Sequence, residues 1–162
     1  MKIARFNAED EDIRRSVRKI LYEEPVQHLT EEEVLATIRL MQLEIALQDG
    51  PRSRYAVTVY RDDERLRHLP DSDKFLAALL DSYHRDALLG YKKLVYCFGG
   101  NMHQWHKVVK VCPIIESQSR TVAGERGGRY LGRGWVLAPY IKTLRSWIIA
   151  NSTNEDFKKL RP

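Results

Sequence analysis

The chain has 162 residues, of which 43% are hydrophobic and 30% are charged, with a formal charge of +5 at pH 7. This length and composition fit one globular domain and exclude a disordered chain. No window approaches the ~18 consecutive apolar residues of a membrane span. Residues 1–6 lack the apolar run of a secretory signal, and two cysteines are too few for a disulfide framework. We therefore expect a cytoplasmic protein with no membrane partner.

The charge is unevenly distributed along the chain. Residues 1–90 hold 14 Lys and Arg against 18 Asp and Glu, whereas residues 91–162 hold 13 against 4. A basic half of this kind favours nucleic acid or another polyanion as partner. The same split also fits acidic and basic halves that face each other, within one fold or between subunits.

Three helices are predicted in the first half. Apolar residues recur at helical spacing over 8–23 and over 73–89. The helix over 31–48 begins at a capping-box pair, Thr30 and Glu33, whose side chains satisfy each other's backbone N–H groups. It is apolar on more than one face, which predicts a central place in the core or at an interface.

The second half is predicted to be mostly extended, followed by a final helix over 139–150. Runs rich in aromatic and β-branched residues predict strands. The predicted strands are Arg54–Tyr60, Arg65–Leu69, Lys92–Phe98, Trp105–Ile115 and Arg129–Val136, with a hairpin turn at Gly99-Gly100-Asn101.

These elements predict one α+β domain over residues 1–162. It consists of a helix-rich acidic half (1–90), a strand-rich basic half (91–150) and a tail (151–162) that is frayed or forms a short docking helix. The N-terminal helices are expected to pack on a mainly antiparallel sheet, together with a C-terminal helix.

A Gly- and Arg-rich segment, Arg120–Trp135, is the strongest candidate for a binding function. Glycine lets backbone approach a phosphate, and arginine pairs with phosphate oxygens through two parallel hydrogen bonds. Aromatic side chains can stack on unpaired bases. The segment resembles, over a very short stretch, the Arg-Gly motifs of RNA-binding tails. The residues expected to act are Arg120, Arg126, Arg129, Tyr130, Arg133 and Trp135.

Further basic residues extend this prediction. Lys107 and Lys110 lie on a predicted strand, and Lys142 and Arg145 lie one turn apart on the final helix. If they surround the Gly- and Arg-rich segment, phosphate contacts are numerous and affinity falls steeply with salt. The ordinary alternative for each residue is a solvated charge.

Two alternatives involve the histidines and cysteines between the predicted strands. Cys97, His103, His106 and Cys112 are all zinc-ligand types, but their spacing lacks the close cysteine pair of a structural zinc site. His103 or His106 beside a phosphate-binding patch could act as an acid–base in cleavage of a phosphate-bearing substrate. No Walker A loop, dinucleotide fingerprint or nucleophile elbow is present, so no cofactor is expected.

Three hypotheses follow. The first is a nucleic-acid-binding module that prefers RNA to DNA, using the basic Gly- and Arg-rich loop and the adjoining basic strand. The second is a structural or assembly protein, of viral or phage type, that self-associates or docks on a partner. The third is a small enzyme acting on a phosphate-bearing substrate. No catalytic motif supports the third.

Overall fold

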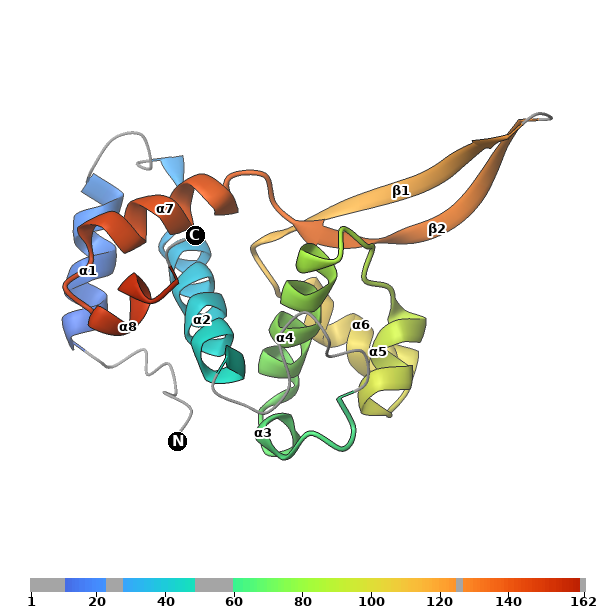
Figure 1. The fold of residues 1–162 in the computed structure, drawn as a ribbon, viewed down its shortest axis with the longest axis horizontal. Coiled ribbons are helices and arrows are strands. Elements are labelled where there is room, and N and C mark those ends of the chain that lie inside the picture. The colour runs from blue at the N-terminus through green and yellow to red at the C-terminus, as the bar shows by residue number, and fades with distance from the viewer. Residues whose placement is uncertain (1–10, 23–27, 49–59, 125–126, 161–162) are drawn as a thin grey trace. The chain divides into compact units, whose positions relative to one another are not determined.

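The computed structural model describes residues 11–22, 28–48, 60–124 and 127–160 (Figure 1). Within these ranges the side chains of residues 11–14, 16 and 122–131 are not described. The described residues form helices and one two-stranded antiparallel sheet, with helices at the C-terminal end. The predicted α+β class is confirmed.

The described elements gather into two compact units. The helical unit contains α1 (Glu11–Tyr22), α2 (Glu31–Gln48), α7 (Ile141–Asn151) and α8 (Glu155–Lys158). The hairpin unit contains α3 (Glu64–Arg67), α4 (Asp71–His84), α5 (Tyr91–Phe98), α6 (Met102–Lys110), β1 (Ile115–Gly124) and β2 (Gly127–Leu137). That both belong to one domain stays a prediction.

The helical unit is built around α2. The predicted capping box is present, since Thr30 Oγ1 accepts from the Glu33 N–H and Glu33 Oε2 accepts from the Thr30 N–H, each at 3.2 Å. Helix α2 is buried on most of its surface, which agrees with a sequence that is apolar on more than one face. Its core neighbours include Val17 of α1, Ile148 of α7, Phe157 of α8 and Leu160 just after α8.

The C-terminal segment is docked rather than frayed. Phe157 is 5% exposed and Leu160 is 8% exposed, and both belong to the core of the helical unit. The Asn154 side chain caps α8 by accepting from the Asp156 N–H at 3.0 Å. Of the two alternatives for the tail, the short docking helix is therefore correct for the described residues.

The strand predicted over 92–98 is wrong, because this segment lies in α5. The strand predicted over 105–115 is wrong as far as Lys110, where α6 ends, whereas Ile115 begins β1. Leu94 and Cys97 are buried three residues apart on α5, and Trp105 and Val109 are buried four residues apart on α6. Burial at helical spacing outweighs the strand propensity of individual aromatic and valine residues.

Two further predictions differ from the structure, and a third falls almost wholly outside the described residues. Residues 64–67 form α3 instead of a strand, because the Asp63 carboxylate caps it by accepting from the Arg65 N–H at 3.0 Å. Helix α4 ends at His84, well before Gly90. The predicted strand Arg54–Tyr60 lies outside the described residues except for Tyr60, which is not in a strand.

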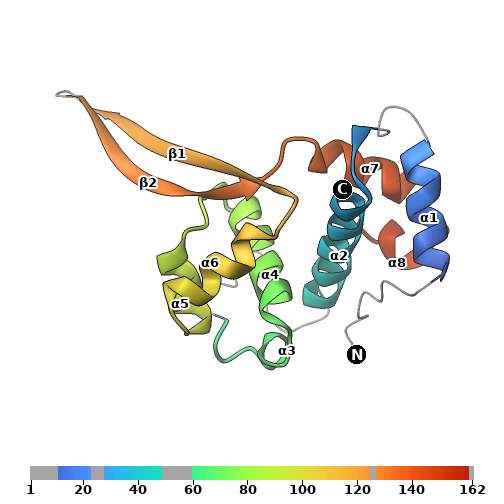
Figure 2. The same cartoon turned by 180° about the vertical axis from the view of Figure 1, so that it is seen from behind.

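The hairpin lies in the Gly- and Arg-rich segment itself, which the sequence predicted as a loop with one late strand. Strands β1 and β2 pair in antiparallel register from Ile115↔Leu137 to Gly124↔Gly127, with an irregularity between Arg120 and Thr121. The late strand predicted over 129–136 is confirmed as part of β2. Helices α5 and α6 lie side by side near the base of the hairpin (Figures 1 and 2).

Candidate nucleic-acid interface

Helix α6 exposes a face that carries two His and two Lys side chains, with Met102, 54% exposed, at its beginning. His103, His106, Lys107 and Lys110 are all exposed, and their spacing of three, four and seven residues places them on one side of the helix. Trp105 is 1% exposed and Val109 is 4% exposed on the opposite side. The helix therefore presents a basic surface while its apolar side is fixed in the core.

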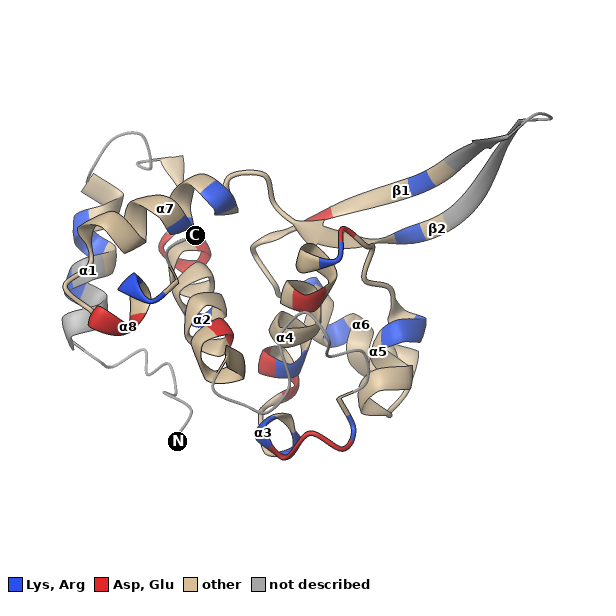
Figure 3. Ribbon diagram, viewed as in Figure 1, with Lys and Arg blue, Asp and Glu red and all other residues tan. Residues whose placement is uncertain are grey.

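No acidic residue occurs between Asp86 and Glu116, so α5 and α6 carry only basic charges (Figure 3). Neither Lys107 nor Lys110 forms an ion pair within the part of the chain that the structure describes. Their charges remain available for a negatively charged partner.

The turn between α5 and α6 is short and depends on glycine. Gly99 has φ 80 and ψ −160, and Gly100 has φ 78, conformations that L side chains rarely adopt. Asn101 Oδ1 then accepts from the Gln104 N–H at 2.9 Å and starts α6.

Two hydrogen bonds anchor α6 on its neighbours. The Gln104 Nε2 donates to Asp71 Oδ2 on α4 at 2.7 Å, and the Trp105 indole donates to the Gly99 carbonyl at 2.9 Å. The basic face thus sits on a helix whose position is set by α4 and by the preceding turn.

Tyr91, the first residue of α5, connects the hairpin to α6. Its hydroxyl lies 2.8 Å from His106 Nδ1, and its ring meets the ring of Trp135 at a centroid distance of 4.5 Å. Trp135 also meets Phe75 of α4 edge-on at 6.3 Å. Trp135 packs the base of the hairpin against α4 and α5, and its predicted stacking on bases stays a prediction.

A backbone bridge fixes the same part of the hairpin. The Leu89 N–H donates to the Trp135 carbonyl at 3.1 Å, and the Trp135 N–H donates to the Leu89 carbonyl at 2.8 Å. Gly134 permits this approach, because a Cβ there would lie 2.5 Å from the Leu89 carbonyl oxygen. The chain between α4 and α5 thereby pairs with β2.

The arginines of the Gly- and Arg-rich segment have different surroundings. Arg120 donates to the Asp86 carbonyl at 2.6 Å and pairs with its carboxylate at 3.2 Å. Arg133 is exposed, and it lies on the same face of β2 as Trp135 because the two residues are two positions apart on the strand. Arg126 and the side chains of Arg129 and Tyr130 lie outside the described residues.

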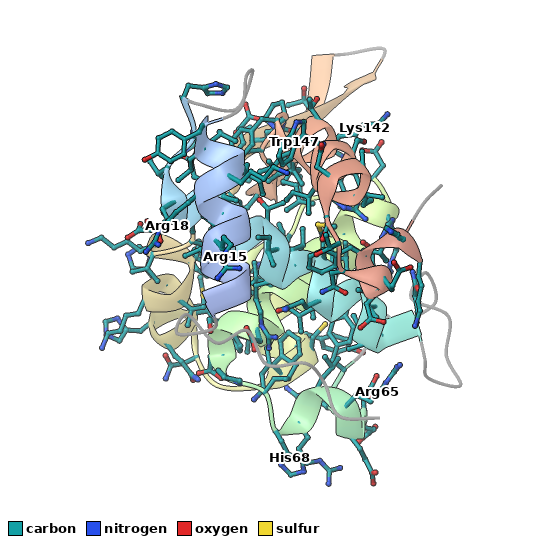
Figure 4. The ribbon with its side chains drawn as sticks, turned by 90° about the vertical axis from the view of Figure 1, so that its left-hand side faces the viewer. Arg15, Arg18, Arg65, His68, Lys142 and Trp147 are labelled. Atoms are coloured by element: carbon teal, nitrogen blue, oxygen red, sulfur yellow. The ribbon has the colours of Figure 1, made fainter. Side chains whose placement is uncertain are left out.

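The two basic residues predicted from the final helix belong to the helical unit. The Arg145 side chain is 14% exposed and forms an ion pair with Glu44 of α2, which is 1% exposed. This ion pair joins α7 to α2 within the helical unit. Lys142 is exposed on α7, and Arg15 and Arg18 are exposed on α1 (Figure 4).

The four potential zinc ligands are not brought together. Cys97 is buried in α5 and Cys112 follows α6, whereas His103 and His106 face outward. Among the described residues, no group of three or more His, Cys, Asp or Glu side chains could hold a metal ion. Burial raises the pKa of both cysteine thiols.

No protein-family model, curated protein or solved structure matches the chain. Within the described ranges, no helix has the length and apolarity needed to cross a membrane. Functional inference therefore rests on the geometry of the hairpin unit.

Sequence reasoning missed the pairing of α5 with α6 and the contact between Tyr91 and His106. One signal was present: Asn101 followed three residues later by Gln104 is the pattern of a helix N-terminus. The Tyr91–His106 contact has no such signal, because it depends on how two helices pack.

Proposed function

We propose that the hairpin unit is a winged helix-turn-helix module that binds double-stranded DNA. Its elements begin with helix α4, the extended bridge at Leu89 and helix α5. They continue with a three-residue turn at residues 99–101, helix α6 and the hairpin β1–β2. In helix-turn-helix proteins the second helix of the pair enters the major groove, and the turn commonly contains glycine. Helix α6 is that second helix here.

The observation that carries this proposal is the exposed face of α6. Its His103, His106, Lys107 and Lys110 offer hydrogen-bond donors and positive charge along one line of the helix. Lysines that neutralise phosphates release counterions, and side chains facing the groove can contact base edges.

The hairpin supplies a second contact. Arg133 is exposed on β2, and the base of the hairpin is held against α4 and α5 by Trp135 and Leu89. A hairpin fixed in this way can place a basic side chain on the sugar-phosphate backbone beside the groove. Arg120 is engaged with Asp86 and is assigned to holding β1.

We infer that DNA is preferred to RNA from the form of the Gly- and Arg-rich segment. The RNA preference rested on a flexible Gly- and Arg-rich loop and on stacking by Tyr130 and Trp135. The segment is a hairpin, and Trp135 is packed between other aromatic rings. The major groove of B-form DNA admits a helix, whereas that of A-form RNA is too narrow for side chains to read.

Fluorescence anisotropy on the full chain tests the proposal. Labelled duplex DNA, single-stranded DNA, duplex RNA and single-stranded RNA are titrated over a range of salt concentrations. We expect a Kd on the order of 10⁻⁶ M or below for duplex DNA, with affinity falling as salt rises. Absence of duplex DNA binding at low salt contradicts the proposal, and tighter binding of single-stranded RNA restores the RNA hypothesis.

A further inference from the structure

We propose that His106 reads a hydrogen-bond acceptor on a base edge and that Tyr91 positions it by fixing its tautomer. This inference rests on the proposed binding of duplex DNA. On the exposed face of α6, His106 then distinguishes between base pairs, whereas Lys107 and Lys110 contact phosphates.

The geometry begins with the Tyr91 hydroxyl, which lies 2.8 Å from Nδ1 of His106. Two arrangements give a hydrogen bond at this distance, because a neutral imidazole nitrogen either donates or accepts. A phenol is a good donor and an imidazole nitrogen without hydrogen is a good acceptor. The favoured arrangement therefore has Tyr91 donating to Nδ1.

The surroundings of Tyr91 support this direction. The Tyr91 phenol carries its proton at neutral pH, because an ordinary tyrosine pKa is about 10 and burial raises the pKa of this hydroxyl further. The Tyr91 ring is held edge-on against Trp135, which limits the positions that the hydroxyl can take. The hydroxyl therefore remains a donor aimed at one place on α6.

With Nδ1 accepting, the hydrogen of a neutral His106 is on Nε2. His106 is exposed on the same face of α6 as Lys107 and Lys110. In the major groove, guanine offers N7 and O6 as acceptors, adenine offers N7 and thymine offers O4. An Nε2–H group held in one position prefers base pairs that have an acceptor opposite that position. A histidine that changes its tautomer or rotates freely has no such preference.

Nitrogen-15 NMR of the free full-length protein at about pH 8 tests the tautomer. We expect the His106 spectrum to report a hydrogen on Nε2 in the wild type and a mixture of tautomers in Tyr91→Phe. The control is Tyr96→Phe on the same helix, because Tyr96 is 65% exposed. A hydrogen on Nδ1 in the wild type, or an unchanged tautomer in Tyr91→Phe, overturns the inference.

Selection from a random duplex DNA library tests the reading role. We expect His106→Ala and Tyr91→Phe to lose preference at the same base pair by at least about fivefold, the lower end of one base contact. Tyr96→Phe keeps the wild-type preference, and Lys107→Gln weakens binding of all sequences alike. Unchanged preference in either His106→Ala or Tyr91→Phe overturns the inference.

The two proposals fail in different ways. If the wild type binds no duplex DNA, the proposed function and the reading role both fail, whatever the tautomer. If the wild type binds duplex DNA and the variants discriminate as well as it does, only the inference fails. Tyr91→Phe keeps the ring that contacts Trp135, and its circular dichroism spectrum checks that the variant is folded.

Discussion

Trp135 of β2 meets Tyr91 of α5 edge-on, with ring centroids 4.5 Å apart. The contact joins the base of the hairpin to the helix that precedes the proposed recognition helix. The sequence predicted Trp135 as a base-stacking residue, and from its packing we expect it to contribute to stability.

Replacing Trp135 tests that expectation. We expect Trp135→Ala to lower the free energy of unfolding by about 3 kcal/mol, the lower end for aromatic truncation in a core, since Trp135 is only partly buried. Trp135→Phe should lose less, because it keeps an aromatic ring against Tyr91. Urea denaturation measures both. A loss of affinity for single-stranded nucleic acid at unchanged stability would contradict the packing role.

Gly134 is expected to be essential for the attachment of the hairpin. A Cβ at this position would lie 2.5 Å from the Leu89 carbonyl oxygen and 3.0 Å from the Leu89 carbonyl carbon. Gly134→Ala must therefore move β2 away from Leu89 and weaken the two hydrogen bonds between Leu89 and Trp135. We expect faster amide hydrogen exchange at Leu89 and Trp135 and a lower Tm. The matched control is Gly90→Ala, whose Cβ meets its nearest neighbour at 3.5 Å. Equal amide protection at Leu89 and Trp135 in Gly134→Ala and Gly90→Ala would contradict the close approach of Gly134 to Leu89.

Arg145 is expected to contribute to stability and not to binding. It forms an ion pair with the buried Glu44, so Arg145→Ala removes one charged hydrogen-bond partner of that carboxylate, at a cost of about 1.5–3 kcal/mol. The control is Lys142→Ala on the same helix, where an exposed side chain should change stability by no more than about 0.5 kcal/mol. Thermal and urea denaturation measure the difference. Similar stability losses in both variants would contradict this account.

The reactivity of the cysteines reports on the packing of α5, which holds Cys97, and of the segment after α6, which holds Cys112. Burial raises the pKa of Cys97 and Cys112, so the reactive thiolate is scarce at neutral pH in the folded protein. We expect slow reaction with a thiol reagent under native conditions and rapid reaction of both thiols in urea. Rapid native labelling of Cys97 is the result that this fold does not allow.

Local signals in the sequence were enough for part of the fold. Thr30 and Glu33 are three residues apart and start α2 by contacts with each other's backbone, so the prediction of that helix was correct. Positions decided by packing were not predictable in the same way. Residues 92–98 have aromatic content typical of a strand, and they form a helix because Leu94 and Cys97 face the core.

The sequence predicted which types of residue form the candidate site, but it did not predict how these residues are arranged in space. The sequence pointed to basic residues after position 90, and Lys107, Lys110 and Arg133 are exposed there. It could not separate these from Arg145, whose partner Glu44 is 101 residues away in the chain. The Tyr91–His106 contact likewise required the tertiary packing of α5 against α6.

The central claim is that the exposed face of α6 contacts duplex DNA, and the salt dependence of binding tests it most directly. The measurement compares the wild type with Lys107→Gln combined with Lys110→Gln. The control combines Lys158→Gln with Lys159→Gln, which removes the same charge from surface ion pairs of the helical unit. We expect the α6 variant to bind duplex DNA more weakly at every salt concentration, with the slope of log affinity against log salt shallower by about 2. The control should keep the wild-type slope. An unchanged slope in the α6 variant, or an equal change in the control, would contradict the claim.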